Sequence, residues 1–173
     1  MLKQASALHI VLLKQASALH IFFEEEEMTR PLPLETITPE AFAPFGTVID
    51  WSDELEATGQ RFHVVMRSEA PTGWRLGVLK VRERVMERME NHPTTEELFA
   101  PIAGQAVIVV APAGPFDEGA IRAFLLNRPV SLKPGTWHDV FTLSEWATVL
   151  IAENLHVTGE RVVLSKPVAA TLD

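Results

Sequence analysis

The sequence predicts a mainly β domain, a sandwich or barrel with one short helix near its start. Short runs of branched and aromatic residues recur along the chain, separated by Gly, Pro, Asn or Asp, as in short strands joined by turns. No long helical segment alternates with these runs, so a doubly wound fold is not expected. The helix is predicted after Thr38, a suitable cap, with Pro39 at its first position and Gly46 ending the unit. The predicted strands are 61–66, 75–81, 105–111, 121–127, 147–153 and 161–164.

The composition indicates one globular domain and argues against several classes of protein. The 173 residues are 47% hydrophobic and 22% charged, which is ordinary for a folded domain. A net charge of -8 argues against a nucleic-acid partner, because phosphate binding needs clustered Lys and Arg. It leaves room for a small anionic substrate, which a few local cations would hold. Without cysteine there are no disulfides or thiolate metal ligands, and no apolar run is long enough for a membrane span, so a cytoplasmic location fits.

The first residues carry a perfect duplication. The segment LKQASALHI occurs at 2–10 and again at 13–21, and an acidic run follows. Natural repeats drift in sequence, so an unaltered duplicate is typical of an added tag or extension. Lys14 and the acidic run also argue against a signal peptide. We therefore expect residues 1–27 to be a non-native extension and residues 28–173 to form a single domain.

The stretch ENHPTTEELFAPIAG, which begins at Glu90, has two interpretations. Thr94 and Glu97 have the spacing of a capping box, so the stretch could start a helix. Pro101 and Gly104 leave room for little more than one helical turn after Glu97, which weakens this interpretation. The alternative is a strand, a turn and a second strand that carry metal ligands. We expect the second arrangement.

The segment that leads into this stretch, 82–91, is equally ambiguous. Its Arg, Glu and Met residues are good helix formers. If the segment is a strand, side chains alternate between its two faces, and one face carries Met86, Arg88, Glu90 and His92. Glu and His side by side inside a barrel are costly unless they are paired or bind a metal. A strand here would therefore indicate a site, whereas in a helix Glu90 and His92 would diverge.

Two short motifs together match the metal-binding pattern of cupin-type β-barrels. In that pattern a first motif reads His-x-His, followed by a Glu and a Gly, and a second motif reads Gly-x-x-His. In this chain Glu90 takes the place of the first histidine. Here the motifs are formed by Glu90, His92, Glu97 and Gly104, and by Gly135 and His138. Each residue alone has an ordinary structural explanation, and their joint spacing is what favours a metal site. Two His and two carboxylates suit a divalent ion such as Mn, Fe, Ni or Zn.

Three cations are candidates for holding a substrate carboxylate. Arg122 lies in an otherwise apolar predicted strand, and its planar fork would bind a carboxylate through two hydrogen bonds if it faces inward. Lys80 and Arg82 are two residues apart and share a strand face. The alternative is that none of them binds a ligand. Lys80 and Arg82 would then lie on a solvated strand face, and Arg122 would be a cation at the edge of the sheet.

Several blocks of the sequence resemble, in the same order, the ureidoglycolate lyases of purine and allantoin catabolism, a cupin-like β-barrel family. They are LPLETITPEAFAPFGTVID, MENHPTTEELFAPIAGQAVIVVAPAG, IRAFLLN and PGTWHDVFTL, and they cover nearly all of the chain from Met28 to about Asn154. Two departures bear on the site. Glu97 stands where the family usually has Gln, and Asp139 follows His138 where the family usually has a second His.

The resemblance implies a carbon–nitrogen lyase that cleaves ureidoglycolate into glyoxylate and urea. This chemistry needs a base for the hydroxyl proton and an acid for the departing urea, and a metal would lower the hydroxyl pKa. The resemblance implies catalytic roles for His138, Glu90 and Asp139. It also implies a divalent metal ion (Mn, Ni, Fe or Zn) held by His92, Glu97, Glu90 and His138, and a substrate carboxylate held by Arg122 with Lys80 or Arg82.

The same resemblance leaves the substrate and the assembly open. The changes at Glu97 and Asp139 are compatible with a cupin metalloenzyme acting on another small 2-hydroxy or 2-oxo acid. A non-catalytic cupin that binds a small acid is a further alternative. Cupin-like proteins often pair through exchanged strands, and the strand predicted at 161–164 could form the shared edge, so we also expect a homodimer.

Overall fold

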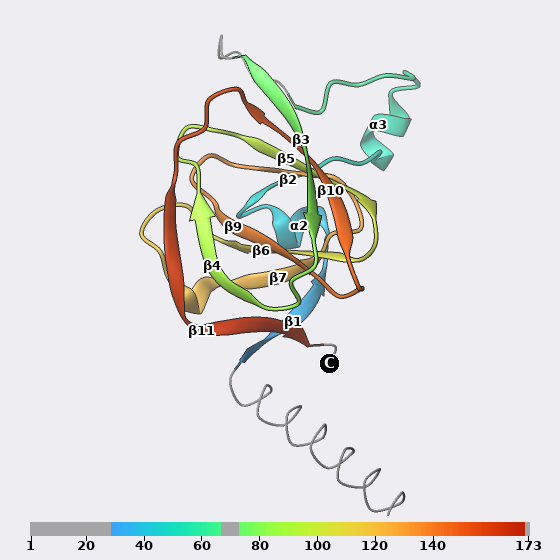
Figure 1. The fold of residues 1–173 in the computed structure, drawn as a ribbon. Coiled ribbons are helices and arrows are strands. Elements are labelled where there is room, and N and C mark those ends of the chain that lie inside the picture. Colours follow the sequence, from blue (N-terminus) through green and yellow to red (C-terminus); the bar gives the residue numbers. More distant parts are fainter. Residues whose placement is uncertain (1–28, 67–72, 172–173) are drawn as a thin grey trace, which may run out of the picture.

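The computed structural model describes residues 29–66 and 73–171, which form a closed β-barrel and a second β-sheet (Figure 1). The neighbouring barrel strands are, in order, β1 (Arg30–Thr36), β11 (Glu160–Thr171), β4 (Met86–Asn91), β9 (Trp137–Thr142), β6 (Ala106–Ala111) and β7 (Arg122–Leu125). β1 closes the barrel because its first half pairs in parallel with β11 and its second half with β7.

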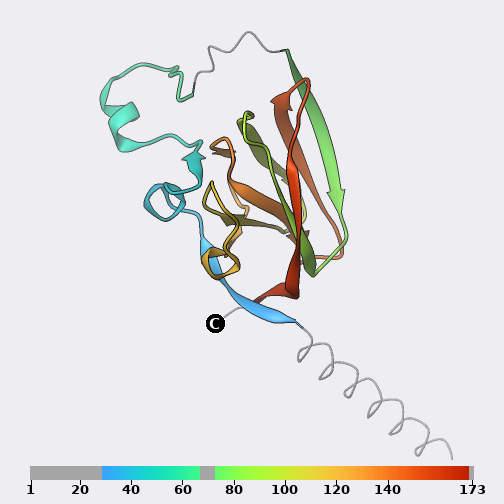
Figure 2. The same ribbon diagram turned by 90° about the vertical axis from the view of Figure 1, so that its left-hand side faces the viewer.

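The second sheet packs against the barrel wall and ends at an edge strand near the candidate site. Its strands are, in order, β2 (Gly46–Val48), β8 (Val130–Leu132), β5 (Glu97–Ala103), β10 (Ala147–Asn154) and β3 (Trp74–Val81). The connections contain the helices α2 (Pro39–Phe42) and α3 (Asp53–Ala57) and the 3-10 turn η1 (Glu118–Ala120). Figure 2 shows both α2 and α3 on the side of the molecule opposite β3.

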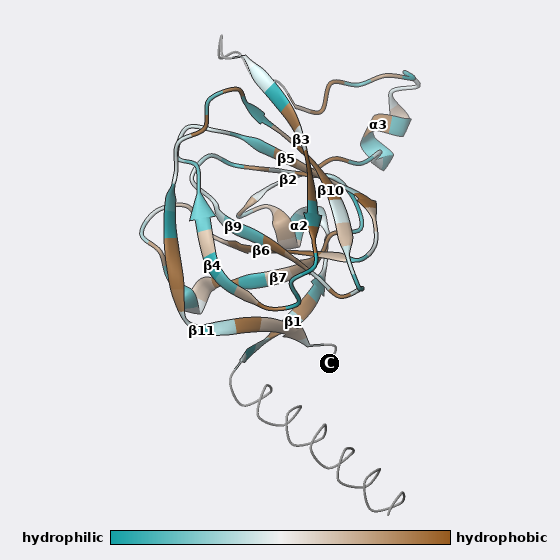
Figure 3. Cartoon of the chain, viewed as in Figure 1, coloured by the Kyte–Doolittle hydropathy of each residue, from teal (hydrophilic) through white to brown (hydrophobic). Residues whose placement is uncertain are grey.

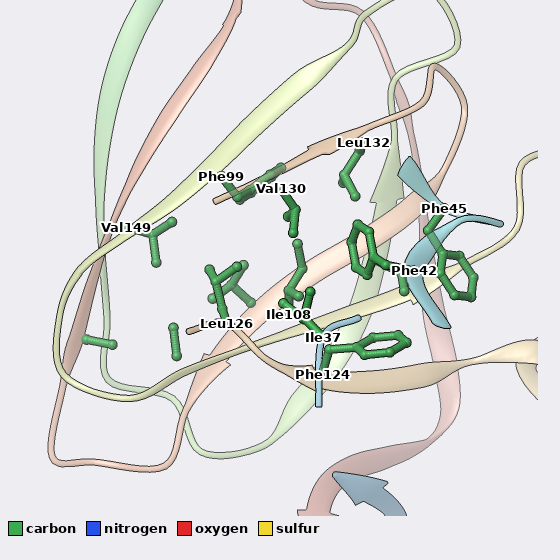
Figure 4. Packing of buried hydrophobic residues seen from close by; sticks show 14 of the residues in the cluster. Ile37, Phe42, Phe45, Phe99, Ile108, Phe124, Leu126, Val130, Leu132 and Val149 are labelled. Atoms are coloured by element: carbon green, nitrogen blue, oxygen red, sulfur yellow. The ribbon is translucent and has the colours of Figure 1, made fainter. Parts of the chain in front are cut away.

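Alternate side chains of β6 divide the core into two clusters. Ile108 and Val110 pack between the barrel wall and the second sheet, whose contributions include Phe99, Val130 and Val149 (Figure 4). Val107 and Val109 belong to the other cluster, which is built from barrel strands and includes Met89, Trp137 and Phe141. β6 is therefore covered on both faces, which explains why its sequence is apolar throughout instead of alternating.

Three aromatic rings hold α2 against the barrel. Phe42 of α2, Phe45 and Phe124 of β7 meet edge to face, with ring centroids 5.3 to 5.9 Å apart (Figure 4). Burial of each ring contributes roughly 2 kcal/mol to folding. The side chain of Thr38 accepts a hydrogen bond from the N–H of Ala41 over 3.1 Å, and Pro39 occupies the first turn. The predicted short helix and its cap are confirmed.

The predicted fold class and most of the predicted strands are confirmed. The chain is a mainly β, cupin-like barrel, and β3, β6, β7, β10 and β11 coincide with or contain predicted strands. The prediction of a strand at 61–66 is wrong, because this segment pairs with no other strand and Phe62 is 77% exposed. Branched and aromatic residues favour a strand only where a neighbour offers hydrogen bonds and a surface to pack against.

The ambiguous segment 82–91 forms a strand from Met86 onward, and Glu97 begins another strand, so the stretch is not a helix start. One detail of its predicted pattern is wrong. Met86 packs with Met89 in the barrel cluster, and not on the face of Glu90. The pairing of β4 with β11 is irregular between Val163 and Val168, and the strict alternation of side chains is lost there.

Three predictions concern the extent and assembly of the chain. The proposed extension at residues 1–27 lies outside the described residues. The single domain at 28–173 and the homodimer stay predictions. No helix in the described part of the chain is long and apolar enough to cross a membrane.

Candidate metal centre and active site

The two halves of the predicted site meet at one end of the space between the barrel and the second sheet. Glu90 of β4 is the strand partner of His138 of β9. The N–H of Gly135 donates to the carbonyl of His92 over 2.9 Å, which ties the turn before β9 to the turn after β4. Gly135 has a φ of 80°, a left-handed conformation that glycine adopts without strain. The backbone itself therefore brings the two motifs together.

Each imidazole of the site is oriented by a backbone carbonyl. Nδ1 of His138 lies 2.9 Å from the oxygen of Thr136, and Nδ1 of His92 lies 3.3 Å from the oxygen of Thr158. A carbonyl oxygen only accepts, so both Nδ1 atoms carry a proton, and both Nε2 atoms face Glu97. Histidines that ligate a metal are held in this way, with the second ring nitrogen donating to an oxygen.

The chain leading into β11 approaches His92 so closely that only glycine fits. A Cβ at Gly159 would lie 2.4 Å from Nδ1 of His92 and 2.2 Å from the carbonyl oxygen of Asn91. Both distances are far below van der Waals contact, so a side chain here would displace the imidazole. Gly159 thus helps to set the position of His92.

Glu97 contacts both imidazoles, whereas Glu90 stands at the outer side of the cluster. Oε2 of Glu97 lies 2.8 Å from Nε2 of His138, and Oε1 lies 3.6 Å from Nε2 of His92. Oε1 of Glu90 is 3.9 Å from Nε2 of His92, and its Oε2 accepts from Nε of Arg161 over 2.8 Å. The side chains of Glu97 and His138 are 5% exposed and that of Glu90 is 33% exposed. Solvent or substrate therefore reaches Glu90 more readily than Glu97.

Burial and pairing act in opposite directions on the pKa values of His138 and Glu97. Burial lowers the pKa of His138, but the hydrogen bond and charge of Glu97 outweigh it, so the pKa of His138 is raised. Burial raises the pKa of Glu97, but the hydrogen bond and the charge of His138 have the larger effect, so the pKa of Glu97 is lowered. Without a metal, each of the two side chains therefore stabilises the charged form of the other.

Glu153 of β10 also belongs to the cluster, although the sequence analysis missed it. Burial and a hydrogen bond with Glu97 raise its pKa. Nε and Nη2 of Arg75 each lie 2.8 Å from Oε1 of Glu153. The signal was present in the sequence, because alternation along β10 places Glu153 on the inward face that carries Ala147, Val149 and Ile151.

Two adjoining cavities give access to the cluster. The inner cavity, of about 430 Å³, is lined by Glu90, His92, Glu97, His138 and Glu153 among others. The outer cavity, of about 550 Å³, is lined mainly by residues of β3, β4 and their connection. The two cavities share Leu79, Glu90, Asp139, Val140 and Arg161. The hydrophilic end of β4 that borders them contrasts with the hydrophobic β6 (Figure 3).

Asp139 lines both cavities, and its pKa is raised above the ordinary value of an aspartate. Burial raises the pKa of Asp139, and the negative charge of Glu90 raises it further. Its Oδ1 accepts a hydrogen bond from the N–H of Val140 over 2.7 Å, which opposes these effects without cancelling them. A carboxyl group in this environment can act as a proton donor.

The three cations predicted to hold a carboxylate occupy different surroundings. Nε of Arg122 donates to Oε1 of Glu35 over 2.7 Å, and Nη1 donates to a carbonyl of α2 over 3.0 Å. Arg122 lines neither cavity, so the structure does not bring it to the cluster. Lys80 lines the outer cavity, with Nζ 4.9 Å from the ring centroid of Trp146. Arg82 is exposed and lines neither cavity.

The donor atoms of the cluster fit a divalent metal ion. Glu90, His92 and His138 each offer a ligand atom within 4.8 Å of the others, and so do His92, Glu97 and Glu153. Imidazole nitrogen and carboxylate oxygen are ligands of Mn, Fe, Ni and Zn. The oriented Nδ1 protons leave the Nε2 atoms for coordination, so the structure contains a possible His/Glu metal site.

Fold and site together define a cupin-like β-barrel domain with a buried cluster of His and Glu side chains. The family described as ureidoglycolate lyase matches residues 29–161, and the chain belongs to this family. The ureidoglycolate lyase of Pseudomonas fluorescens (strain Pf0-1) is 31% identical over 141 residues, which are 72% of this chain and 84% of the relative. That of Burkholderia cepacia is 36% identical over 123 residues, 62% of this chain and 70% of the relative.

Solved structures share parts of the fold at low sequence identity. The capsular polysaccharide assembling protein CapF of Staphylococcus aureus has a TM-score of 0.41 and 18% identity, covering 51% of this chain and 25% of that one. A dTDP sugar isomerase of Desulfovibrio desulfuricans has a TM-score of 0.41 and 18% identity, covering 58% and 72%. The oxalate decarboxylase of Bacillus subtilis, described with Mn(II) centres, has a TM-score of 0.39 and 18% identity, covering 54% and 24%.

Proposed function

We propose that this chain cleaves ureidoglycolate into glyoxylate and urea. Its membership of the ureidoglycolate lyase family and the names of its relatives support this reaction. The structural observation that carries the proposal is the convergence of two oriented imidazoles and two carboxylates in the inner cavity. Such a cluster is costly to bury unless it binds a metal or moves protons, and the proposed reaction uses both.

His92, His138 and Glu97 would hold the metal. Glu97 contacts both imidazoles, at 2.8 and 3.6 Å, and Glu90 stands farther from His92, at 3.9 Å. A divalent ion, of which Mn, Ni, Fe and Zn suit these ligands, supplies a positive charge that lowers the pKa of a substrate hydroxyl group. Glu153 supports Glu97 through their hydrogen bond and stays close enough to share the site.

Glu90 would accept the hydroxyl proton of ureidoglycolate. Its carboxylate is the more exposed one of the cluster and borders both cavities, so a bound substrate can approach it. When the proton moves to Glu90, the oxygen electrons form the aldehyde carbonyl of glyoxylate and the carbon–nitrogen bond breaks. General base catalysis of this kind contributes about 10²- to 10⁴-fold to the rate.

Asp139 would protonate the nitrogen of the departing urea. Its pKa is raised by burial and by Glu90, so its acid form persists to higher pH than that of an ordinary Asp. The proton taken up by Glu90 and the proton given by Asp139 balance, and exchange with water restores both groups. His138 holds its place between Glu97 and the carbonyl of Thr136 and would act as a ligand.

The reaction is tested by measuring glyoxylate and urea released from racemic ureidoglycolate, with a chelator and then with added Mn or Ni. We expect release to stop with the chelator and to return with the metal. His92→Ala and His138→Ala should lose turnover, while His156→Ala, a change of an exposed histidine, should not. Normal turnover by both the His92 and His138 variants would rule out the proposed site.

The variant Glu90→Gln distinguishes a role of Glu90 as the general base from a role as a metal ligand. If Glu90 is the base, the variant binds metal with unchanged affinity in calorimetry and loses about 100-fold or more in kcat. Equal losses in metal affinity and turnover would instead make Glu90 a ligand. Glu96→Gln, a change of an exposed acid that lines neither cavity, is the matched control for charge.

A second candidate function follows from Glu97 and Asp139. Both differ from the residues usual in the family pattern, and both lie in or beside the inner cavity. A metal-dependent enzyme acting on another small 2-hydroxy or 2-oxo acid would use the same cluster. Turnover of such an acid at a higher kcat/KM than ureidoglycolate would favour this candidate.

A further inference from the structure

The guanidinium and ammonium groups beside the cluster are mostly engaged by the protein itself. Arg75 binds Glu153, with two nitrogens 2.8 Å from one carboxylate oxygen. Arg161 donates to Glu90 over 2.8 Å. Lys80 lies over the ring of Trp146. The two arginine contacts orient acidic residues and occupy those guanidinium groups, whereas the ammonium group of Lys80 lies on a ring and forms no ion pair with a described residue.

Arg88 differs from these cations. It lies on β4 two residues before Glu90 and lines the outer cavity. Within residues 29–66 and 73–171, no carboxylate lies close enough to form an ion pair with Arg88, and its guanidinium makes no hydrogen bond to another described residue. Its positive charge nevertheless acts on Asp139 and lowers the pKa of that carboxyl group, against the effect of burial. Arg88 therefore lines the outer cavity, and its guanidinium group has no partner among the described residues.

The outer cavity is lined by more carboxyl groups than cations, so an anionic ligand there needs a positive charge that faces it. The carboxyl groups on its walls are those of Glu83, Glu87, Glu90 and Asp139, and the chain as a whole has a net charge of -8. A ligand carboxylate entering these surroundings is repelled unless a positive charge faces it. Arg88 supplies that charge, and the planar fork of its guanidinium matches a carboxylate with two hydrogen bonds.

We propose that Arg88 binds the carboxylate of the substrate, and that the outer cavity is the anion subsite of the active site. This inference rests on the proposed function and names the residue that orients its substrate. Two residues along a strand span roughly 7 Å, so a two-carbon acid held by Arg88 places its neighbouring carbon beside Glu90. The hydroxyl group then lies towards the inner cavity, and the nitrogen lies towards Asp139, which borders both cavities.

The test compares Arg88→Ala and Arg88→Lys with Arg84→Ala. Arg84 is an exposed arginine in the connection before β4 that lines neither cavity, so its removal changes the net charge equally. For Arg88→Ala we expect KM for ureidoglycolate to rise about 10- to 100-fold, with metal affinity unchanged in calorimetry. Arg88→Lys should fall between the wild type and Arg88→Ala. Wild-type KM in Arg88→Ala, or an equal rise in Arg84→Ala, would overturn the proposal.

A binding measurement separates this inference from the proposed reaction. Glyoxylate is titrated into chelator-treated wild type, Arg88→Ala and Arg84→Ala, and binding is followed by calorimetry and by chemical shifts. We expect the wild type and Arg84→Ala to bind glyoxylate and Arg88→Ala to lose at least 10-fold in affinity. This result would support the anion subsite even if the wild type did not cleave ureidoglycolate. Equal glyoxylate affinity of all three proteins would overturn the subsite whether or not the lyase reaction occurs.

Discussion

The imidazole of His138 and the carboxylate of Glu97 meet across the space between the two sheets, with Nε2 2.8 Å from Oε2. His138 comes from β9 of the barrel and Glu97 from β5 of the second sheet. Both side chains are buried, so each charge depends on the other for compensation. The proposed metal-binding cluster is therefore also a link between the two layers of the fold.

Replacement of Glu97 should weaken both metal binding and the fold. Glu97→Gln removes a proposed ligand and leaves His138 without its anionic partner. We expect metal affinity to fall by at least about 100-fold and the free energy of unfolding of the metal-free protein to fall by about 3 kcal/mol near pH 6. Calorimetry and urea unfolding measure the two effects. Glu96→Gln, at the exposed neighbouring position, should change neither.

The stability of the metal-free protein should depend on pH through the same pair. The pKa of Glu97 is lowered from 4.5, so its contribution is present above that value and is lost as the pH falls through the lowered pKa. The pKa of His138 is raised from 6.5, so its contribution is present below that value and is lost as the pH rises through the raised pKa. The pair therefore stabilises most between pH 4.5 and 6.5.

This dependence is measured as the difference in unfolding free energy between wild type and His138→Asn over a range of pH. The difference should be greatest inside the window and decline on both sides. His156→Asn, at an exposed position, should give no such maximum. A difference that keeps growing above neutral pH would contradict the assigned pair.

Substitution of Gly159 should damage the site without touching a ligand. In Gly159→Ala the new Cβ must displace His92, whose Nδ1 it would otherwise approach to 2.4 Å. We expect metal affinity to fall about 10- to 100-fold, the range found when support of a ligating histidine is lost. Gly77→Ala is the matched control, because a Cβ there meets nothing within 4 Å. Unchanged metal binding by Gly159→Ala would show that His92 is not a ligand.

The pH dependence of turnover should reveal Asp139 as the proton donor. Burial raises its pKa, and only the protonated form donates, so kcat/KM should decrease as the pH rises through that pKa. Asp139→Asn should lower kcat by about 10²- to 10⁴-fold, flatten this decrease and leave metal affinity unchanged. A pH–rate profile of both proteins tests this. An alkaline decrease that persists in Asp139→Asn would assign it to another group.

Local patterns in the sequence predicted much of the fold and part of the candidate site. Thr38 and Pro39 define the helix start by local hydrogen bonding, which requires no knowledge of the fold. The clustering of Glu90, His92, Glu97 and His138 followed from motif spacing, because strands joined by tight turns bring such motifs to one end of a barrel. Glu153 was missed because it belongs to neither motif, and only the alternation of side chains along β10 indicates its position.

Other features depend on contacts that a sequence pattern does not contain. The segment 61–66 has the residues of a strand but no partner strand. The guanidinium of Arg122 is occupied by Glu35 of β1, which lies 87 residues away in the sequence. The sequence pattern predicts Arg88 on the strand face of Glu90 and indicates no role for it, and the fold places it on a cavity wall. Long-range pairing decides which arginine stays available.

The most direct measurement is the simultaneous release of glyoxylate and urea from ureidoglycolate by the metal-loaded wild-type chain, with His138→Ala assayed in parallel. We expect equal amounts of the two products from the wild type, and a loss of both in the variant, because His138 lies at the centre of the cluster with Glu97 and the carbonyl of Thr136. Absence of both products from the metal-loaded wild type, or equal release by His138→Ala, would contradict a lyase reaction at this site.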